Sequence, residues 1–301
     1  MYSFSKKNEN PISNYFPTIT LIIPMYNEEK VIKEKIENTA HLDYPGDRLK
    51  IILLNDNSTD DSKSISLAAI EKNSLKASVI DNLGGKGKAR ALNWIFPSLD
   101  TEITVISDAD ALLKSDSLLH IVKNYSDLKV GGVTGKIITV SDKSRSSKSH
   151  EDSYRFYFDI WRRGESNLHS VSVCNGPLMS FRTALLKKIS IDPDIYADDS
   201  DILFKIIRLD HRVLYDPQAK VFERVPLSIR GRMIQKMKRI NGLRKVYIRN
   251  LDMLGKGVFG KIIYPYALLT HIISPIIILL LVLLYPLVII QNYIYSIMSL
   301  I

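Results

Sequence analysis

Ile103-Thr104-Val105-Ile106-Ser107-Asp108-Ala109-Asp110 joins an apolar, β-rich run to two carboxylates. Two other acidic clusters stand at expected strand ends, namely Asn55-Asp56-Asn57-Ser58-Thr59-Asp60 after the apolar residues 51–54, and Asp198-Asp199-Ser200-Asp201. Carboxylates that gather in this way repel one another, so they need a cation or a polar ligand. Because ligands of an open α/β sheet bind beyond the carboxyl ends of its strands, the sequence predicts a metal-dependent site for a phosphorylated substrate.

The segments around these clusters alternate between strand and helix patterns. Short β-rich runs predict strands at 18–24, 49–54, 77–80, 103–107, 130–140, 171–173, 178–181, 213–215 and 219–222. Helical spacing of apolar residues predicts helices at 28–40, 62–72, 88–95, 153–165 and 198–209. This alternation predicts an α/β fold with a mostly parallel sheet and helices on both faces.

The C-terminal part has the composition of a membrane anchor. Residues 262–290 carry no charged side chain, and about 20 apolar residues are enough to cross a bilayer. Pro265, Pro275 and Pro286 would kink or divide such a helix, so a kinked hairpin is the alternative to a single crossing, and a buried core helix is a further one. The preceding residues 229–251 repeat apolar residues at helical spacing opposite a basic face, which suits a helix in the membrane interface or one packed on the catalytic domain.

The distribution of charge predicts an orientation. The formal net charge is +9, its excess lies just before the apolar run, and no Lys or Arg follows Lys261. The positive-inside rule then places the N-terminal domain in the cytoplasm, at the cell membrane, with anionic lipid headgroups rather than nucleic acid as the partner of the basic stretch. Residues 1–17 form a polar tail without a signal-peptide pattern, and the single cysteine, Cys174, excludes an intrachain disulfide.

Several short motifs occur in an order that resembles the family 2 glycosyltransferases. They are Pro24-Met25-Tyr26-Asn27-Glu28, the cluster at 55–60, Gly87-Lys88-Ala89-Arg90-Ala91-Leu92-Asn93, Asp108-Ala109-Asp110, Asn175-Gly176-Pro177-Leu178-Met179-Ser180-Phe181-Arg182 and the cluster at 198–201. The resemblance implies a GT-A catalytic domain over 18–225. We expect it to be followed by an amphipathic interfacial helix at 226–255, a transmembrane segment at 262–290 and a tail at 291–301.

The resemblance also implies a metal site. Asp108 and Asp110 would hold Mg²⁺ or Mn²⁺ together with the diphosphate of a UDP- or GDP-sugar, and hard oxygen ligands suit these ions. Neighbours one residue apart point to opposite sides of an extended chain, so a turn must bring the two carboxylates to one cation. Lys88 would contact phosphate, because its ammonium and the helix N-terminus both favour anions.

The remaining site residues follow the same resemblance. Asp56 would contact the base of the nucleotide, and Pro24, Tyr26 and Glu28 would form another wall of the nucleotide-sugar pocket. Asp199 would act as the general base that removes a proton from the acceptor hydroxyl, in a single displacement that inverts the anomeric carbon.

A last motif bears on the product. Residues 235–239 partly match the Gln-x-x-Arg-Trp motif of processive family members, with Gln235 matched, Lys238 at the place of Arg and Arg239 at the place of Trp. Gln235 and Arg239 would face the diphosphate. The missing Trp and the scarcity of spans favour transfer of one sugar to a lipid or glycan acceptor. The alternatives are a processive polysaccharide synthase, whose channel would need a homo-oligomer, and, from another class, a nucleotidyltransferase.

Overall fold

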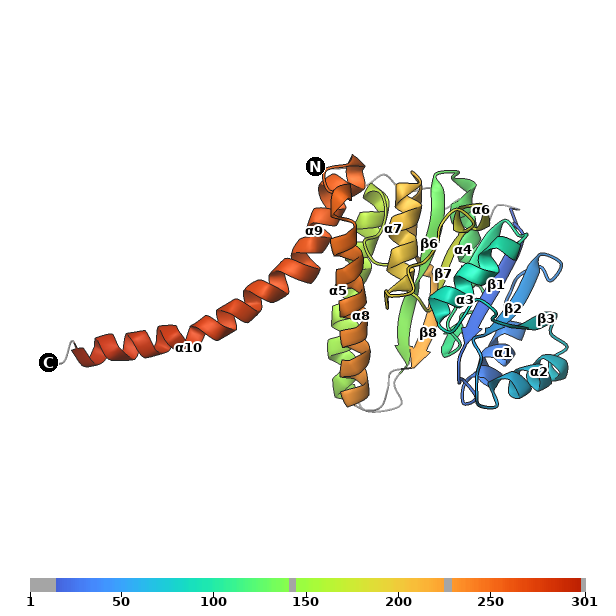
Figure 1. Cartoon of the computed structure of the whole chain (residues 1–301), viewed down its shortest axis with the longest axis horizontal. Coiled ribbons are helices and arrows are strands. Elements are labelled where there is room, and N and C mark those ends of the chain that lie inside the picture. Colours follow the sequence, from blue (N-terminus) through green and yellow to red (C-terminus); the bar gives the residue numbers. More distant parts are fainter. Residues whose placement is uncertain (1–14, 141–144, 225–228, 299–301) are drawn as a thin grey trace.

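An eight-stranded mixed sheet organises the computed structural model, which describes residues 15–140, 145–224 and 229–298 (Figure 1). Its strand order is β3-β2-β1-β4-β7-β6-β8-β5. The strands are β1 (Ile19–Met25), β2 (Leu49–Asn55), β3 (Ala77–Asp81), β4 (Ile103–Ile106), β5 (Ala111–Leu113), β6 (Val130–Val140), β7 (Met179–Arg182) and β8 (Arg212–Arg224).

The first four strands of this order are parallel, and this half positions the site. β1 pairs with β2 up to Met25 and Asn55, and with β4 up to Ile22 and Ile106. The carboxyl ends of β1, β2 and β4 therefore lie at one edge of the sheet, where ligands of α/β folds bind. β7 is antiparallel to both β4 and β6, β8 is parallel to β6, and β5 is antiparallel to β8.

Helices cover both faces of the sheet, as the alternating pattern predicts. One face packs against α1 (Ile32–Ala40), α2 (Ser62–Lys72) and α4 (Ser117–Val122), and the other against α3 (Lys88–Ile95), α6 (Thr183–Leu186) and α7 (Asp198–Arg208). Successive residues of β1 serve opposite faces, with Leu21 and Ile23 in one core cluster and Ile22 in the other. Each is fully buried, which contributes roughly 1.5–3 kcal/mol per side chain.

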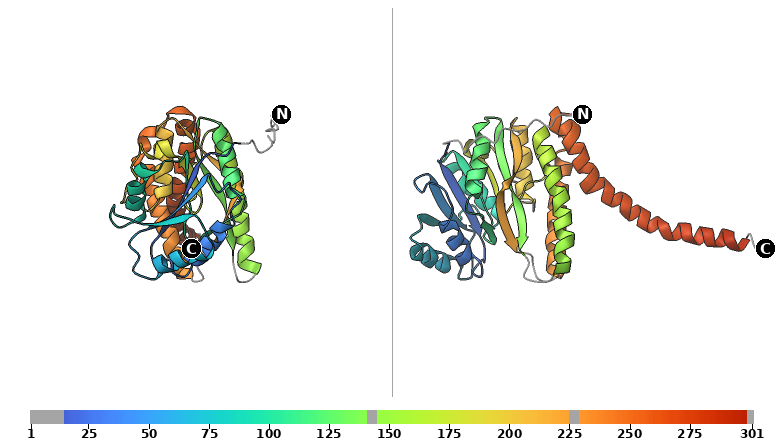
Figure 2. Two further views of the ribbon diagram at one scale, coloured as in Figure 1. Left: turned by 90° about the vertical axis from the view of Figure 1, so that its right-hand side faces the viewer. Right: turned by 180° about the vertical axis from the view of Figure 1, so that it is seen from behind.

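Two long helices, α5 (Arg145–Leu168) and α8 (Ile229–Arg249), stand at the end of the sheet from which α10 departs (Figures 1 and 2). The chain then passes through Phe259–Ile263, α9 (Tyr264–Leu268) and Leu269–Ile273 into α10 (Ser274–Met298). The first part of this region belongs to the core of the domain. The ring of Phe204 on α7 packs at 5.2–5.7 Å, centroid to centroid, from the rings of Tyr247, Phe259 and Tyr264.

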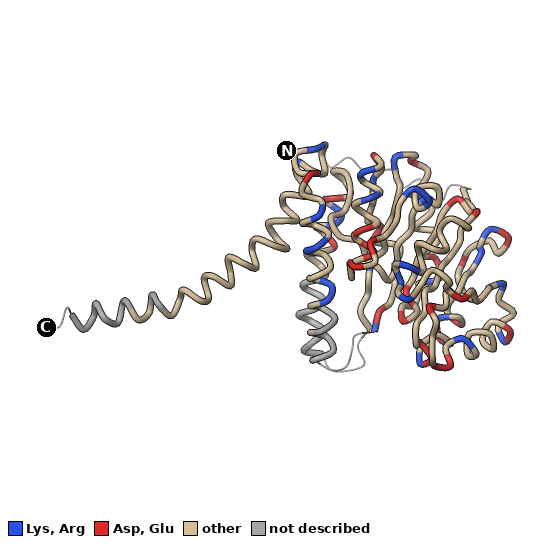
Figure 3. Tube along the Cα trace, viewed as in Figure 1, with Lys and Arg blue, Asp and Glu red and all other residues tan. Residues whose placement is uncertain are grey.

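By contrast, α10 projects away from the domain, and its described part carries no charge (Figures 1 and 3). In the described residues, Phe259–Pro286 is the one helix long and apolar enough to cross a membrane, by length and composition. α10 runs through Pro286 without dividing, so the structure favours the single crossing over the kinked hairpin.

Two predictions of strands were wrong. Residues 171–173 form a loop and no strand. Val171 is buried there, and its amide donates to the carbonyl oxygen of Val213 at 2.9 Å, but this single backbone bond between the three residues and β8 is too little to form a ladder. The two short strands predicted at 213–215 and 219–222 are one strand, β8. The three-residue β5, directly after the Asp-Ala-Asp segment, had no prediction because it is too short to show a periodic pattern.

Candidate functional site

A tight turn follows β4 and carries the two aspartates. The amide of Ala111 donates to the carbonyl of Asp108 at 3.2 Å, and β5 begins at Ala111. This turn is the one that the sequence requires if Asp108 and Asp110 are to face one cation. It lies at the sheet edge where β1 and β2 also end.

Lys88, the first residue of α3, reaches this turn. Its Nζ lies 2.7 Å from Asp108 Oδ1 and 3.3 Å from Asp198 Oδ2. Burial alone would raise the pKa of Asp108, but the Lys88 ammonium holds it below its ordinary value. Lys88 follows Gly87, whose φ of +119° lies in the region that glycine adopts easily. The glycine loop thus turns the start of α3 toward the carboxylates.

Asp199 faces the same space from α7. Its Oδ2 accepts a hydrogen bond from the amide of Gly176 at 3.1 Å. Burial, and next the charge of Asp198, raise the pKa of Asp199 to about 6. A Cβ added to Gly176 would lie 3.5 Å from Asp199 Oδ2 and 3.6 Å from Asp108 Oδ2. The bare backbone of Gly176 therefore leaves room between the predicted base and the predicted metal ligand.

The carboxylates around the turn suit a divalent cation. Burial, and next the charge of Asp108, raise the pKa of Asp110, and burial with Asp110 and Asp108 raises that of Glu28 to about 7. Asp198 Oδ2 is buried and makes no hydrogen bond in the described residues, and the Lys88 ammonium lies 3.3 Å from it. No group of three or more His, Cys, Asp or Glu side chains suited to a metal occurs within the described ranges. Asp108 and Asp110 are therefore the residues of this turn that could hold a cation.

Asp56 is held in place from two sides. Its carboxylate accepts hydrogen bonds from Asn82 Nδ2 at 2.7 Å and from the amide of Gly87 at 2.8 Å. Sequence reasoning missed Asn82, since a lone Asn after a strand gives no signal of its own. Asp56 thus links the end of β2 to the glycine loop that leads to Lys88.

The other predicted wall residues are more open. Tyr26 is 39% exposed, and its hydroxyl accepts a hydrogen bond from Lys86 Nζ at 3.0 Å while that ammonium also lies 4.7 Å from the ring centroid. Pro24 is half-buried near the end of β1. Lys86 and Tyr26 thus form a cation–π pair at the edge of the predicted nucleotide-sugar pocket.

Arg239 and Gln235 lie on α8. Arg239 Nη2 is 2.9 Å from Glu223 Oε1. Burial raises the pKa of Asp108, whereas the charge of Lys88 lowers it and the charge of Arg239 lowers it by less. The side chain of Gln235 lies outside the described residues, so its role stays a prediction.

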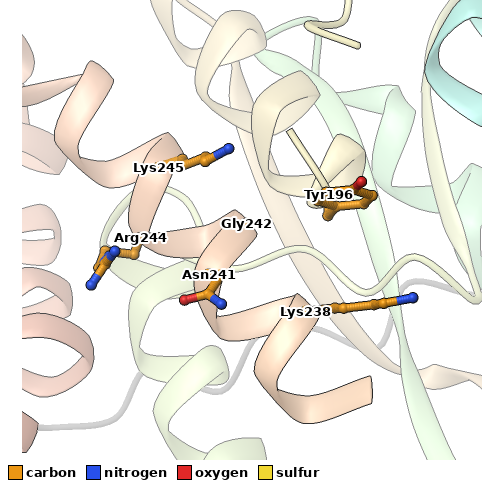
Figure 4. A pocket seen from close by; sticks show the side chains of 6 residues that line it. All are labelled: Tyr196, Lys238, Asn241, Gly242, Arg244 and Lys245. Carbon is orange, nitrogen blue, oxygen red and sulfur yellow. The ribbon is translucent and has the colours of Figure 1, made fainter. Parts of the chain in front are cut away.

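A cavity of about 370 Å³ opens on the α8 side of the site (Figure 4). It is lined by Tyr196, Lys238, Asn241, Gly242, Arg244 and Lys245. A Cβ on Gly242 would lie only 2.8 Å from the carbonyl carbon of Tyr196, so α8 packs closely on the segment that leads into Asp198 and Asp199. This basic cavity therefore borders residues 196–197, which directly precede α7 with Asp198 and Asp199.

The structure thus brings together an aspartate turn after a parallel strand, a lysine at a helix start on that turn and a further carboxylate across Gly176, which is the arrangement that the GT-A resemblance predicts. Residues 20–189, more than half of the chain, match the family model "Glycosyl transferase family 2", and the chain belongs to this family.

Curated relatives extend this match. The poly-beta-1,6-N-acetyl-D-glucosamine synthase of Staphylococcus epidermidis is 24% identical over 234 residues, which are 77% of this chain and 56% of that protein. The protein of the same name from Staphylococcus aureus (strain COL) is 25% identical over 251 residues, 83% of this chain and 60% of that protein. The chain thus spans 56–60% of the length of these relatives.

Solved structures agree on the fold. The mannosyltransferase PcManGT from Pyrobaculum calidifontis, in complex with GDP-Man and Mn²⁺, is 28% identical with a TM-score of 0.70, over 86% of this chain and 74% of that chain. S. aureus TarS 1–349 in complex with UDP-GlcNAc is 19% identical with a TM-score of 0.53, over 77% of this chain and 66% of that chain. The second likeness shows the GT-A fold alone.

Proposed function

We propose that the chain is a membrane-anchored, inverting glycosyltransferase that moves a sugar from a nucleotide-diphosphate sugar to a membrane-associated lipid or glycan. The observation that carries this proposal is the convergence of Lys88, Asp108 and Asp199 around Gly176. The Lys88 ammonium and a cation held at Asp108 would suit the leaving diphosphate, and Asp199 would suit the attacking hydroxyl.

The donor half of the reaction needs positive charge. Asp108 and Asp110 would hold Mg²⁺ or Mn²⁺, and such an ion supplies charge that stabilises the departing nucleoside diphosphate. Lys88 supplies a second positive charge at the same place, from the start of α3. Asp56 with Pro24, Tyr26 and Glu28 would form the wall that receives the nucleoside, and Arg239 and Gln235 would approach the diphosphate from α8.

The acceptor half needs a base. Asp199 would take the proton of the acceptor hydroxyl as that oxygen bonds to the anomeric carbon and the bond from this carbon to the diphosphate oxygen breaks. This single displacement inverts the anomeric carbon. A carboxylate with a pKa of about 6 is ionised at neutral pH and is a stronger base than an ordinary aspartate, which helps proton removal.

The surroundings of α8 support a membrane-associated acceptor. Met233, Met237 and Ile240 are each 60% exposed, whereas Tyr247 on the same helix is buried in the core. One part of α8 therefore packs on the domain, and the other offers exposed apolar side chains. We propose the division into a catalytic domain at 18–225, an interfacial helix at 226–255 and a span at 262–290, with the domain in the cytoplasm.

A processive polysaccharide synthase is the second candidate, supported by the names of the curated relatives. Product sizing after incubation of membranes with donor distinguishes the two, because a ladder of long chains would support the polymer and one added sugar would support single transfer.

Metal-dependent hydrolysis of UDP- and GDP-sugars by the purified full chain tests the proposal as a whole. The likeness to a mannosyltransferase solved with GDP-Man makes GDP-mannose the first donor to try. Failure of every donor, with pyrophosphate release from nucleoside triphosphates instead, would contradict the proposal in favour of a nucleotidyltransferase.

A further inference from the structure

Lys35 is a fully buried lysine in the middle of α1. It lies on the buried stripe of that helix with Ile32, Ile36 and Thr39. Its ammonium makes no ion pair of 4 Å or less with a carboxylate in the described part of the chain. Burial lowers the pKa of Lys35 to about 7, so the fold keeps this amine despite a cost in solvation. The nearby charges of Asp108 and Asp110 offset part of this cost, so the reason for keeping the amine lies at the aspartate turn.

The contacts of Lys35 point to the aspartate turn. Its Nζ donates to Ser107 Oγ at 2.7 Å and to the carbonyl oxygen of Ala111. These two residues directly flank Asp108-Ala109-Asp110. The lysine therefore holds both ends of the turn from beneath, at a place that substrate does not reach.

The same contacts continue toward the predicted base. Ser107 Oγ donates in turn to the carbonyl oxygen of Pro177 at 2.9 Å. The preceding residue, Gly176, donates its amide to Asp199 Oδ2 at 3.1 Å. Lys35, Ser107 and the Gly176-Pro177 segment thus form one buried polar connection between the metal turn and the carboxylate across the site.

We propose that Lys35 is a positioning residue that holds the Asp108-Asp110 turn and, through Ser107, the Gly176-Pro177 segment that contacts Asp199 in one fixed arrangement. This inference rests on the proposed function, since the distance between the metal turn and the base decides the transfer geometry. Groups that orient metal ligands from behind typically change metal affinity or activity by about 10–100-fold when they are replaced.

The test compares Lys35→Met with two other variants of the full chain. Methionine matches the lysine in length and suits a buried site, but it donates no hydrogen bond. Ser107→Ala keeps the lysine and breaks the connection to Pro177. Ile36→Val is the matched control, because Ile36 is fully buried on the same helix and makes no polar contact. The readouts are the Kd of Mn²⁺ with GDP or UDP, kcat at saturating donor, and Tm.

We expect Lys35→Met to bind Mn²⁺ and nucleotide at least about tenfold more weakly and to lose at least about tenfold in kcat. Ser107→Ala should lose kcat with a smaller change in Kd, and Ile36→Val should change only Tm. A folded Lys35→Met protein with wild-type Kd and kcat would overturn the inference, as would unchanged kcat in Ser107→Ala. If the wild type itself bound no nucleotide with metal, the proposed function would fail instead, so the two failures are distinguishable.

Discussion

The donor side and the acceptor side of the site differ in how completely the protein builds them. On the donor side, Asp56 and Asp108 have fixed partners and lie on turns between buried strands. On the acceptor side, Tyr196 is 74% exposed and the cavity beside it is lined by Lys238, Arg244 and Lys245. Under the proposed function, this difference makes the donor half the preorganised part of the site and the open half the part that receives the acceptor.

Asp199 stands at the boundary of these two sides, and its replacement should have the largest effect. Asp199→Asn keeps the size of the side chain and removes the base, so transfer should fall by about 10²–10⁴-fold. Donor binding should stay within about twofold of wild type, because Asn still accepts the bond from Gly176. Initial rates with saturating donor, beside a titration with nucleotide, measure both. Full transfer activity in this variant would contradict the role of Asp199.

Lys88→Met tests the donor side alone. The variant removes the Lys88 ammonium, which lies beside Asp108 and would stabilise the leaving diphosphate, so kcat should fall by about 10²-fold. Lys63→Met is the control, since Lys63, on α2 of the opposite face, pairs with the exposed Asp81 at the end of β3. Equal activities of the two variants would remove Lys88 from the proposed mechanism.

The pH profile should report the raised pKa of Asp199. The base works when ionised, so kcat should rise with pH and level off above about 6. Asp198→Asn removes a neighbouring negative charge, which should move this midpoint to lower pH by up to about one unit. Rates from pH 4.5 to 8 at saturating Mn²⁺ measure the shift. A midpoint that stays in place, or moves upward, would show that another group controls the profile.

Substitutions on the acceptor side should have smaller effects. Lys238→Gln and Lys245→Gln each remove an exposed charge, so the rate at limiting acceptor membranes should fall roughly two- to fivefold. The KM for the donor should not change. A change confined to the donor KM would mean that this cavity serves the nucleotide and would reverse the comparison.

The smallest effect concerns stability. A carboxyl whose pKa is raised in the folded state favours folding below its unfolded pKa and loses that contribution as the pH rises through about 6. Asp199→Asn should therefore raise the Tm at pH 7.5 by roughly 2–4 °C, for about 1 kcal/mol. The gain should vanish near pH 4, and thermal unfolding at both pH values measures it. An equal rise in Tm at pH 4 and at pH 7.5 would show that packing, and not the charge of Asp199, causes it.

The sequence predicted the donor side well because its signals are local. The apolar runs at 18–24, 49–54 and 103–107 appear as β1, β2 and β4, and each cluster of polar residues follows directly in sequence. The GT-A fold and the family are confirmed by the comparisons. The roles of the individual site residues remain predictions.

The misses arise from contacts between segments far apart in the chain. Lys35 has the sequence setting of a solvent-facing lysine, and only the packing of α1 under the aspartate turn shows its contact with Ser107. Residues 171–173 have a strand composition, but their backbone bonds to β8 only from Val171 to Val213 and forms no ladder. The partners of Asp56 are similarly distant, since Asn82 follows a different strand.

The most direct test of the account is a calorimetric titration of the full chain, in detergent or a nanodisc, with GDP- and UDP-sugars with and without Mn²⁺. We predict that the wild type binds one of these donors only when Mn²⁺ is present, and that Asp110→Ala binds none. Equal binding without the metal, or undiminished metal-dependent binding by Asp110→Ala, would contradict the claim that the turn after β4 is the centre of the site.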